Sequence, residues 1–372
     1  MGKHSILPPS SAHMWSKCTG WVAMNASLTE DEDSEAARIG TAVHELAESL
    51  IKGGVFIEVA SNGVLIDEEL TERALVMVDD VLGTTTKFLG TPLVEQQLSI
   101  PTIHRECFGT PDVAFYSKAI HTLYIWDYKD GFGIVEPFEN EQLIIYYSGL
   151  LSYFNIVDDE RLVVVMRIVQ PRGYHRDGPI REWRCRGSEL RPYVTRISNA
   201  AQSSLNGTGQ CKADEHCRYC KALFSCEAAL QKGIALFDTV SAPVSLEMTP
   251  EAMAFQYELI QKASKMLEYL TVSYEAKIVA SITSGRKIPG WTLEQSYGRR
   301  TWNKDIDLEE LVAIGKACGV TLLKPRELVT PTQAKNKKMD ESILAAYSHT
   351  PKNGLSLNKI DPRKALKAFN II

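Results

Sequence analysis

The 372-residue sequence lacks the segments that carry proteins across or into membranes. No stretch approaches the roughly eighteen consecutive apolar residues of a membrane-spanning helix. The first residues, "MGKHSILPPSSAHMWSKC", contain no basic segment followed by an apolar core and a small-residue cleavage site. We therefore expect neither secretion nor a membrane partner, and a reducing cytoplasm is the expected compartment.

The sequence also lacks an excess of positive charge and an ATP-binding loop. Its 41 Lys and Arg residues against 46 Asp and Glu residues give a net charge of -5, which excludes a histone-like protein coated in positive charge. A nucleic acid would therefore have to bind a local basic groove. The pattern GxxxxGK[ST] is absent, so the chain is not expected to unwind DNA by itself.

What is present is the composition of a globular protein, 44% hydrophobic and 23% charged. Apolar residues at helical spacing predict helices over 40–54, 67–89, 139–155 and 188–205. Runs rich in β-branched and aromatic residues predict strands over 92–101, 109–117, 122–130, 161–171 and 181–186. The order of helix, three strands, helix and strand predicts an α/β or α+β core.

Changes in composition divide the chain into three predicted regions. Residues 1–35 form a polar segment that carries Cys18, residues 36–235 form the α/β domain and end in a cysteine cluster, and residues 236–372 are mainly helical.

A long helix is predicted in the third region. Thr249 and Pro250 give an N-cap and a first-turn proline, and the helix should end near Gly285. Its apolar residues recur at near-heptad spacing, so we expect it to pack against the core or against another chain, as in a homo-oligomer.

Two acids and a lysine follow an apolar run in "LYIWDYKDGFG", residues 123–133. An i, i+2 pair on a strand points to one face, so Asp127 and Lys129 can address one metal-bound water. If the two strands are adjacent and antiparallel, Asp112 lies beside them. Such acids plus a cation suit metal-dependent phosphodiester hydrolysis, whereas a purely structural ion pair would give little stability. Asp130 is expected only to turn the chain.

Five of the eight cysteines also form a pattern, which consists of Cys18 and the stretch "CKADEHCRYCKALFSC". In a reducing compartment such clustering indicates a metal centre rather than disulfides. Cys217, Cys220 and Cys226 are close enough in sequence to bind one centre, and the fourth ligand is Cys18 or Cys211. Local spacing favours Cys211, and a zinc knuckle would suit that choice.

These motifs, in this order, resemble the signature of the PD-(D/E)XK nucleases. "GTPD", then fourteen residues, then "DYK" fits its acid-acid-lysine pattern, and the predicted element order matches its αβββαβ, restriction-endonuclease-like core. "GTAVH" and "QLIIY" fit the GxxxH and QxxxY motifs of the RecB-like branch. The chain also looks similar, from about residue 10 to about residue 230, to uncharacterised phage and bacterial RecB-like proteins.

The resemblance implies roles for residues of a metal site. His44, Asp112, Asp127 and the Tyr128 carbonyl would hold Mg²⁺ or Mn²⁺, while Lys129 would position the attacking water. For His44 the alternative is a hydrogen-bonded core histidine.

Three further residues have weaker support. Gln142 and Tyr146 lie one helical turn apart, and the resemblance implies that they contact the DNA strand or the lysine, with helix packing as the alternative. Glu95 is a candidate for binding the metal through water.

The resemblance also bears on the cysteines. Cys18 with Cys217, Cys220 and Cys226 is similar to the iron-sulfur staple of AddB-type helicase-nucleases and of the CRISPR adaptation nuclease, with a [4Fe-4S] cluster as the implied centre. This favours Cys18 as the fourth ligand, while the additional Cys211 keeps structural Zn²⁺ as an alternative.

Basic and aromatic residues alternate in "YGRRTW". Arg299, Arg300 and Trp302 would suit phosphate contact and base stacking. The alternative is a solvated surface with tucked aromatic side chains.

Together these features predict a metal-dependent deoxyribonuclease, an exonuclease that processes DNA ends in recombination, replication or repair. The expected partners are DNA ends or single strands, together with a recombinase, an annealing protein or a helicase, in a bacterial cell and with a phage gene as one source. The alternatives are a non-catalytic DNA-binding or assembly protein on the same fold and a site-specific endonuclease.

Overall fold

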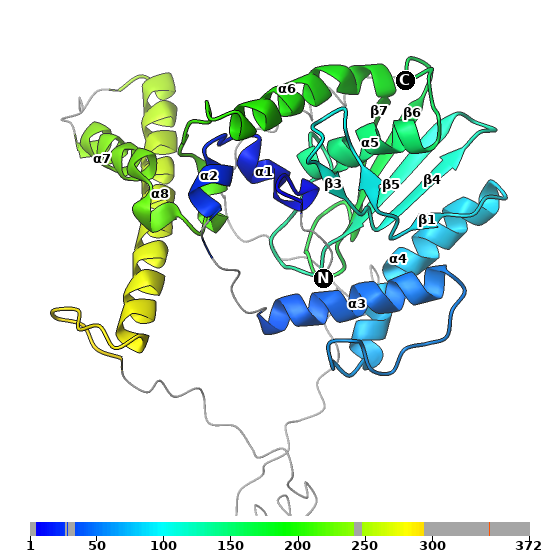
Figure 1. Ribbon diagram of the computed structural model, residues 1–372, viewed down its shortest axis with the longest axis horizontal. Helices are drawn as coiled ribbons and strands as arrows, with labels where there is room; N and C mark the ends of the chain where they lie inside the picture. Colours follow the sequence, from blue (N-terminus) through cyan, green and yellow to red (C-terminus); the bar gives the residue numbers. More distant parts are fainter. Residues whose placement is uncertain (1–4, 27, 29–33, 242–247, 294–341, 343–372) are drawn as a thin grey trace, which may run out of the picture. The chain divides into compact units, whose positions relative to one another are not determined.

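A five-stranded mixed sheet organises the fold in the computed structural model (Figure 1), which describes residues 5–26, 28, 34–241, 248–293 and 342. The strands lie in the order β1-β4-β5-β6-β7, with bounds Leu93–Val94, Val113–Ser117, Thr122–Tyr128, Val163–Val169 and Ile180–Arg186. Strands β5 and β6 are parallel, and the other neighbours are antiparallel. The predicted α/β class is confirmed.

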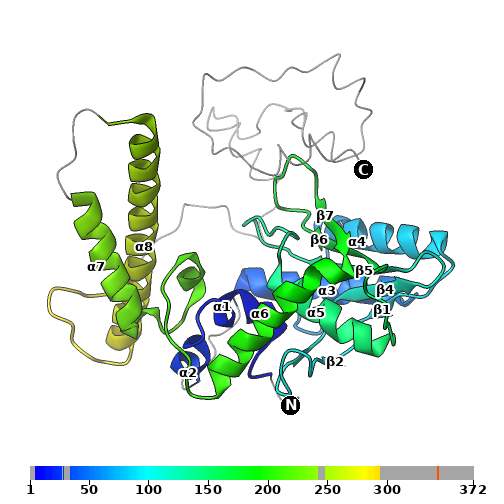
Figure 2. The same cartoon turned by 90° about the horizontal axis from the view of Figure 1, so that it is seen from above.

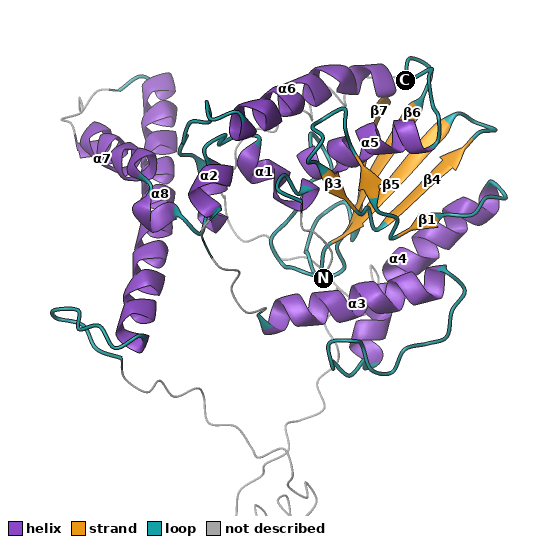
Figure 3. Ribbon diagram, in the orientation of Figure 1, coloured by secondary structure: helices purple, strands orange, loops and turns teal. Residues whose placement is uncertain are grey.

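Helices cover both faces of this sheet (Figures 1 and 3). Those packed on one face are α3 (Glu35–Ile51) and α4 (Glu68–Lys87), and those packed on the other are α5 (Glu141–Tyr153) and α6 (Gly187–Leu205). The faces form two separate apolar clusters, because side chains alternate along each strand.

The alternation along β5 decides which layer each of its residues meets. Leu123 and Ile125 pack in the α5 layer, whereas Tyr124, Trp126 and Tyr128 pack in the α3 and α4 layer. The same period of two directs Asp127 toward α5.

Polar side chains cap the main helices at their first residues. Ser34 accepts a hydrogen bond from the Ala37 N–H at the start of α3, and Asp67 accepts one from the Leu70 N–H at the start of α4. Asn140 caps α5 in the same way. Such caps satisfy backbone donors that have no partner within the helix, which fixes where each helix begins.

The N-terminal segment is part of the α/β core. It forms η1 (Pro9–Ser11), α1 (Ala12–Trp15) and α2 (Trp21–Asn25). Leu7, Ala12 and Trp15 are fully buried in the apolar cluster that includes α5. The mostly polar segment 1–35 therefore contributes apolar side chains to the core.

Helix α7 (Glu227–Ser241) follows the cysteine cluster, contains position 235 and packs on α8 (Pro250–Thr283). The chain divides after Leu293 into units 1–293 and 294–372.

The strand predicted over 92–101 is two short strands in different sheets. β1 joins the main sheet, whereas β2 (Leu98–Ser99) pairs with β3 (Phe108–Gly109) in a separate two-stranded sheet. Glu95 lies between them with a φ of 50°, a left-handed conformation that is uncommon for a residue with a side chain. This bend, which the alternating sequence did not reveal, ends β1.

The long helix is confirmed as α8 (Pro250–Thr283), with the Thr249 side chain accepting from the Ala252 N–H. Its 34 residues give a length of about 51 Å. It lies beside α7 (Figure 2), and buried Ala263, Met266 and Leu270 face the apolar cluster that also contains Cys217.

None of the helices within the described residues combines the length and the apolar character of a membrane-spanning segment.

Two helical glycines give a matched test of the packing. A Cβ at Gly149 of α5 would lie 2.9 Å from Ile100 Cγ1, whereas a Cβ at Gly83 of α4 would meet no atom within 4 Å. Gly149→Ala should lower the free energy of unfolding by about 1–3 kcal/mol because it overpacks the core. Gly83→Ala should raise it by about 0.5–1 kcal/mol because alanine favours the helix. Urea denaturation of both variants measures this, and equal effects would contradict the packing of α5 described above.

Candidate active site

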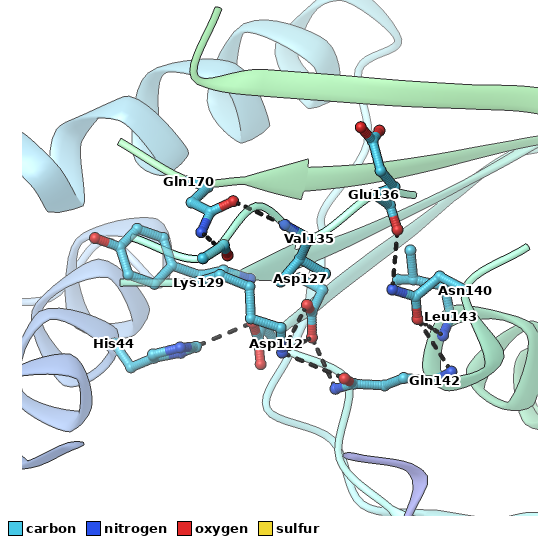
Figure 4. A network of polar contacts seen from close by, with 12 residues as sticks. His44, Asp112, Asp127, Lys129, Val135, Glu136, Asn140, Gln142, Leu143 and Gln170 are labelled. Atoms are coloured by element: carbon cyan, nitrogen blue, oxygen red, sulfur yellow. Dashed lines mark hydrogen bonds and ion pairs between the residues drawn. The ribbon is translucent and has the colours of Figure 1, made fainter. Parts of the chain in front are cut away.

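Three side chains meet at the carboxyl end of β5 and form a closed polar network (Figure 4). Lys129 Nζ lies 2.8 Å from Asp127 Oδ2 and donates to Gln142 Oε1 at 3.2 Å. Gln142 Nε2 in turn donates to Asp127 Oδ1 at 2.8 Å. Gln142 comes from the first turn of α5, so the helix and the strand hold the acid and the lysine in one fixed arrangement.

The pairing of β4 with β5 brings Asp112 to the same place. Val113 pairs with Trp126 in an antiparallel register, so Asp112 reaches the end of β5. There its Oδ2 accepts a hydrogen bond from the Tyr128 N–H at 2.6 Å. The predicted meeting of Asp112 with Asp127 and Lys129 thus depends on this register.

His44 and Glu95 complete a second group around Asp112. The ligand atoms of His44, Glu95 and Asp112 lie within 4.8 Å of one another, and no other group of three potential metal ligands is this close among the described residues. His44 Nδ1 is 3.8 Å from Asp112 Oδ2, and its ring packs edge-on against Tyr128. Glu95, the weakest of the sequence candidates, is brought in by the left-handed bend after β1.

The acids at this site repel one another. Burial, and next the Asp112 carboxylate, raise the pKa of Glu95 to about 8. Burial raises the pKa of Asp112, His44 lowers it and Asp127 raises it, and together these bring it to about 6. Burial lowers the pKa of Lys129, but Asp127 and Asp112 outweigh burial and hold it above its usual value. Lys129 is therefore a stable cation rather than a base.

The residues at the site fit a hard divalent cation. Two carboxylates and an imidazole within 4.8 Å of one another form a donor set that suits Mg²⁺ or Mn²⁺. Asp127 is 1% exposed and lies next to this group, where Lys129 Nζ is its ion-pair partner. A cation would offset the repulsion that raises the acids' pKa values.

Two predicted contributions to the site are not seen in the form expected. Asp127 bonds to Lys129 and Gln142 and is not in the group of three ligands. For Tyr128, the observed contact with the acids is its amide N–H to Asp112, not its carbonyl.

Asp130 does more than turn the chain, and the prediction for it was wrong. The strand period directs it to the face opposite Lys129, where it is buried. Its Oδ1 accepts from the Tyr128 hydroxyl at 3.0 Å, and its Oδ2 lies 3.3 Å from Arg73 and 3.5 Å from Arg172. Asp130 thereby anchors the end of β5 to α4 through its ion pair with Arg73, which is distant in the sequence.

Tyr146 lies behind the network rather than in it. It is buried one turn after Gln142, to which its side chain hydrogen-bonds. Burial, and next the Asp127 carboxylate, raise the pKa of Tyr146 above its usual value, so it stays a neutral phenol. The spacing correctly placed both residues on the face of α5 that meets the lysine strand.

Gln170 and Arg181 are polar residues near the site that the sequence analysis missed. Gln170 is fully buried and donates to the Gly131 and Gly133 carbonyls at 2.6 and 2.8 Å. Arg181 donates to the Val135 carbonyl at 2.7 Å. The only sequence signal was a polar residue directly after an apolar strand, which is also common in solvent-exposed turns.

The five clustered cysteines come together where the N-terminal segment meets the loop after α6. The Gly20 N–H donates to the Gln210 carbonyl at 2.9 Å, and the Lys212 N–H donates to Cys18 Sγ at 3.5 Å. A Cβ at Gly20 would lie 2.6 Å from Cys211 Sγ, so this close approach requires glycine. Distant Cys18 is thus beside the downstream cysteines.

The cysteine sulfurs are acceptors as well as neighbours. Cys217 Sγ accepts from the Asp214 N–H at 3.4 Å and Cys220 Sγ from Asn25 Nδ2 at 3.8 Å, while Cys211 hydrogen-bonds to both Cys18 and Cys226. Burial raises the pKa of Cys217 to about 11 and that of Cys211 to about 12, the latter helped by Cys18 and Cys226. A bound metal would be needed to hold these groups as thiolates.

The predicted DNA contacts Arg299, Arg300 and Trp302 lie outside the described residues.

The chain matches a known protein family. The family described as "Protein of unknown function (DUF2800)" matches residues 4–362, which is nearly the whole chain.

The raised pKa values predict a pH-dependent stability of the metal-free protein. A carboxyl group whose pKa is higher in the folded than in the unfolded protein favours the fold most while it is protonated, below its unfolded pKa of about 4. This contribution to stability is lost as the pH rises through about 6 for Asp112 and about 8 for Glu95. The EDTA-treated protein should therefore melt at a lower temperature at pH 8.5 than at pH 6. Mn²⁺ should raise the melting temperature more at pH 8.5, because it binds the ionised acids.

Glu95→Gln should flatten this pH dependence, whereas exposed Glu58→Gln should leave it unchanged. An unaltered pH dependence in the Glu95 variant would show that Glu95 is not under this electrostatic stress.

Proposed function

The chain belongs to the DUF2800 family of proteins of unknown function, and we propose that it is a metal-dependent deoxyribonuclease with a PD-(D/E)XK core. The observation that carries the proposal is the convergence of Asp112, Asp127 and Lys129 at the joint end of β4 and β5. Asp127 and Lys129 lie 15 and 17 positions after Asp112 in the sequence. In the fold these three residues form one contiguous group with His44, which comes from a separate helix.

The order of elements supports the same core. Helices α3 and α4 precede β1, β4 and β5, helix α5 follows, and β6 lies parallel to β5. This is the αβββαβ order of the nucleases that the motifs resemble. The acid-acid-lysine group lies at the end of the central strands, as the resemblance implies.

The two polar groups would have different roles in the reaction. His44, Asp112 and Glu95 would hold Mg²⁺ or Mn²⁺, with Asp127 next to them. When bound, the metal would activate water and offset negative charge on the phosphate. Lys129 would place its ammonium next to the attacking water, and Gln142 keeps both Lys129 and Asp127 in position.

The charge of Lys129 favours a catalytic role over a purely architectural one. A buried pair of Asp127 and Lys129 gives little net stability, and Asp112 and Glu95 add repulsion beside it. A fold that needed only an ion pair would be more stable without these extra acids. The site is therefore better explained by a function that requires a cation and a phosphate.

The resemblance to the RecB-like branch favours DNA ends as substrate, so we propose an exonuclease that acts in recombination, replication or repair. A recombinase, annealing protein or helicase would then act on the same DNA. The alternatives of a DNA-binding protein without cleavage and of a site-specific endonuclease differ in what they do to linear and circular DNA.

We also propose a [4Fe-4S] cluster held by Cys18, Cys217, Cys220 and Cys226. The resemblance of the four-cysteine pattern to the iron-sulfur staple supports a multi-iron centre, and the proximity of distant Cys18 to the downstream cysteines supports its part in it. N–H groups of other residues donate to the sulfurs of Cys18, Cys217 and Cys220, which supports the proposal that these cysteines bind as thiolates. The cluster would join the N-terminal segment to the loop after α6 and needs no redox role.

The nuclease proposal is tested on end-labelled linear DNA and circular DNA with Mn²⁺. Asp127→Asn and Lys129→Met should each slow cleavage by roughly 10²–10³-fold, because each removes a charge that acts on the transition state. Exposed Asp238→Asn on α7 serves as the control and should cleave like wild type. Digestion of linear but not circular DNA identifies an exonuclease. Equal cleavage by wild type and Asp127→Asn would contradict the assignment, and DNA binding without cleavage would favour the non-catalytic alternative.

The cluster proposal is tested by anaerobic purification with an absorption spectrum and metal analysis. Wild type and Cys211→Ser should be coloured and contain iron, whereas Cys18→Ser should lose both, because its sulfur is the distant fourth ligand. A colourless wild-type protein with stoichiometric zinc would overturn the iron-sulfur assignment. Loss of iron in Cys211→Ser alone would identify Cys211 as the fourth ligand.

A further inference from the structure

Two loops follow the parallel strands β5 and β6 at their carboxyl ends. One loop runs from Lys129 to Asn140 before α5, and the other runs over 170–179 before β7. In α/β sheets, ligands bind at the carboxyl ends of parallel strands. The first loop begins at the candidate catalytic lysine, so what these loops carry lies next to the site.

Buried polar side chains hold the two loops together. Gln170 of the second loop donates to the carbonyls of Gly131 and Gly133 in the first, and its Oε1 accepts from the Val135 N–H at 3.2 Å (Figure 4). Arg181, which is 3% exposed, donates to Gln170 Oε1 at 2.5 Å and to the Val135 carbonyl. The first loop is therefore fixed along its length.

Each braced loop nevertheless presents an aromatic ring to solvent. Phe132 is 68% exposed and Tyr174 is 85% exposed. A rigid loop that exposes a phenyl ring forgoes the free energy that burial would give. Exposed aromatic rings beside a site are typical of surfaces that bind a partner.

A cation is stacked on the first ring. The Arg172 guanidinium carbon lies 4.0 Å from the Phe132 ring centroid, and Arg172 Nη1 lies 3.5 Å from Asp130 Oδ2. Asp130 also pairs with Arg73, which in turn pairs with Glu69, so the ion pairs hold Arg172 in place against the ring. An aromatic ring and a guanidinium group are thus joined to Asp130, the residue that follows Lys129.

We propose that Phe132, Arg172 and Tyr174 form a platform that stacks the unpaired bases of a single-stranded DNA end and delivers the adjoining phosphate to the metal site. This inference rests on the proposed nuclease function and specifies its substrate. Unpaired bases offer open π-faces, which aromatic rings and guanidinium planes bind without regard to sequence. Paired bases inside a duplex are already stacked on both faces.

The test measures base stacking directly. Wild type, Phe132→Ala/Tyr174→Ala and Phe255→Ala are mixed with a single strand that carries 2-aminopurine near its end, with Ca²⁺ in place of Mn²⁺ and with the DNA checked for intact length. Phe255, on α8, is 65% exposed and is the matched control. A blunt duplex of the same length is the second ligand.

Wild type and Phe255→Ala should quench the 2-aminopurine fluorescence, because the base stacks on the platform. The double variant should lose the quenching and bind the single strand about tenfold or more weakly, while its affinity for the blunt duplex stays unchanged. Phe132→Trp should retain the quenching. Unchanged quenching in the double variant, or equal weakening of duplex binding, would overturn the platform.

Cleavage with Mn²⁺ is measured on the same proteins, so that the two proposals can fail separately. If wild type cuts DNA but the double variant quenches like wild type, the platform is wrong and the nuclease stands. If no protein cuts DNA but the loss of quenching follows the double variant, the nuclease is wrong and a single-strand binding surface stands. If wild type neither cuts nor quenches, the rings serve another class of partner and both proposals fail.

Discussion

The repulsion among carboxylates at the end of the central strands is the constraint on which the site depends. Glu95 and Asp112 lie together beside Asp127, and burial raises the pKa values of Glu95 and Asp112. Lys129 offsets part of the negative charge, and its own pKa rises as a result. The surrounding fold must supply enough stability elsewhere to hold these acids in place.

The alternation of side chains along β5 divides the polar groups between two layers. Asp127 and Lys129 bond to α5 through Gln142, whereas Tyr128 and Asp130 bond to each other and to α4 through Arg73. The candidate catalytic residues Asp127 and Lys129 therefore lie on one face of β5, and Tyr128 and Asp130, which anchor the strand, lie on the other. Because both sets belong to consecutive residues, a shift of one position in register would exchange them.

The chain closes on itself away from the sheet, at the cysteines. Segment 18–20 pairs with segment 210–212 through backbone hydrogen bonds and the Cys18 sulfur. Leu7 and Trp15 of the same N-terminal segment are buried beside α5, the helix that carries Gln142. The cysteine cluster and the candidate active site thus share one structural support, although they are separate in the sequence.

The sequence by itself determined the α/β class, the Thr249 cap that starts α8, and the pairing of Asp127 with Lys129, because these follow from local periodicity and spacing. It also grouped the downstream cysteines. Only the tertiary structure decided that Glu95 joins Asp112 and His44, since that requires a left-handed bend and a strand register. It likewise decided that Asp130 is a buried anchor rather than a turn residue, because its partners Arg73 and Arg172 lie 57 and 42 positions away.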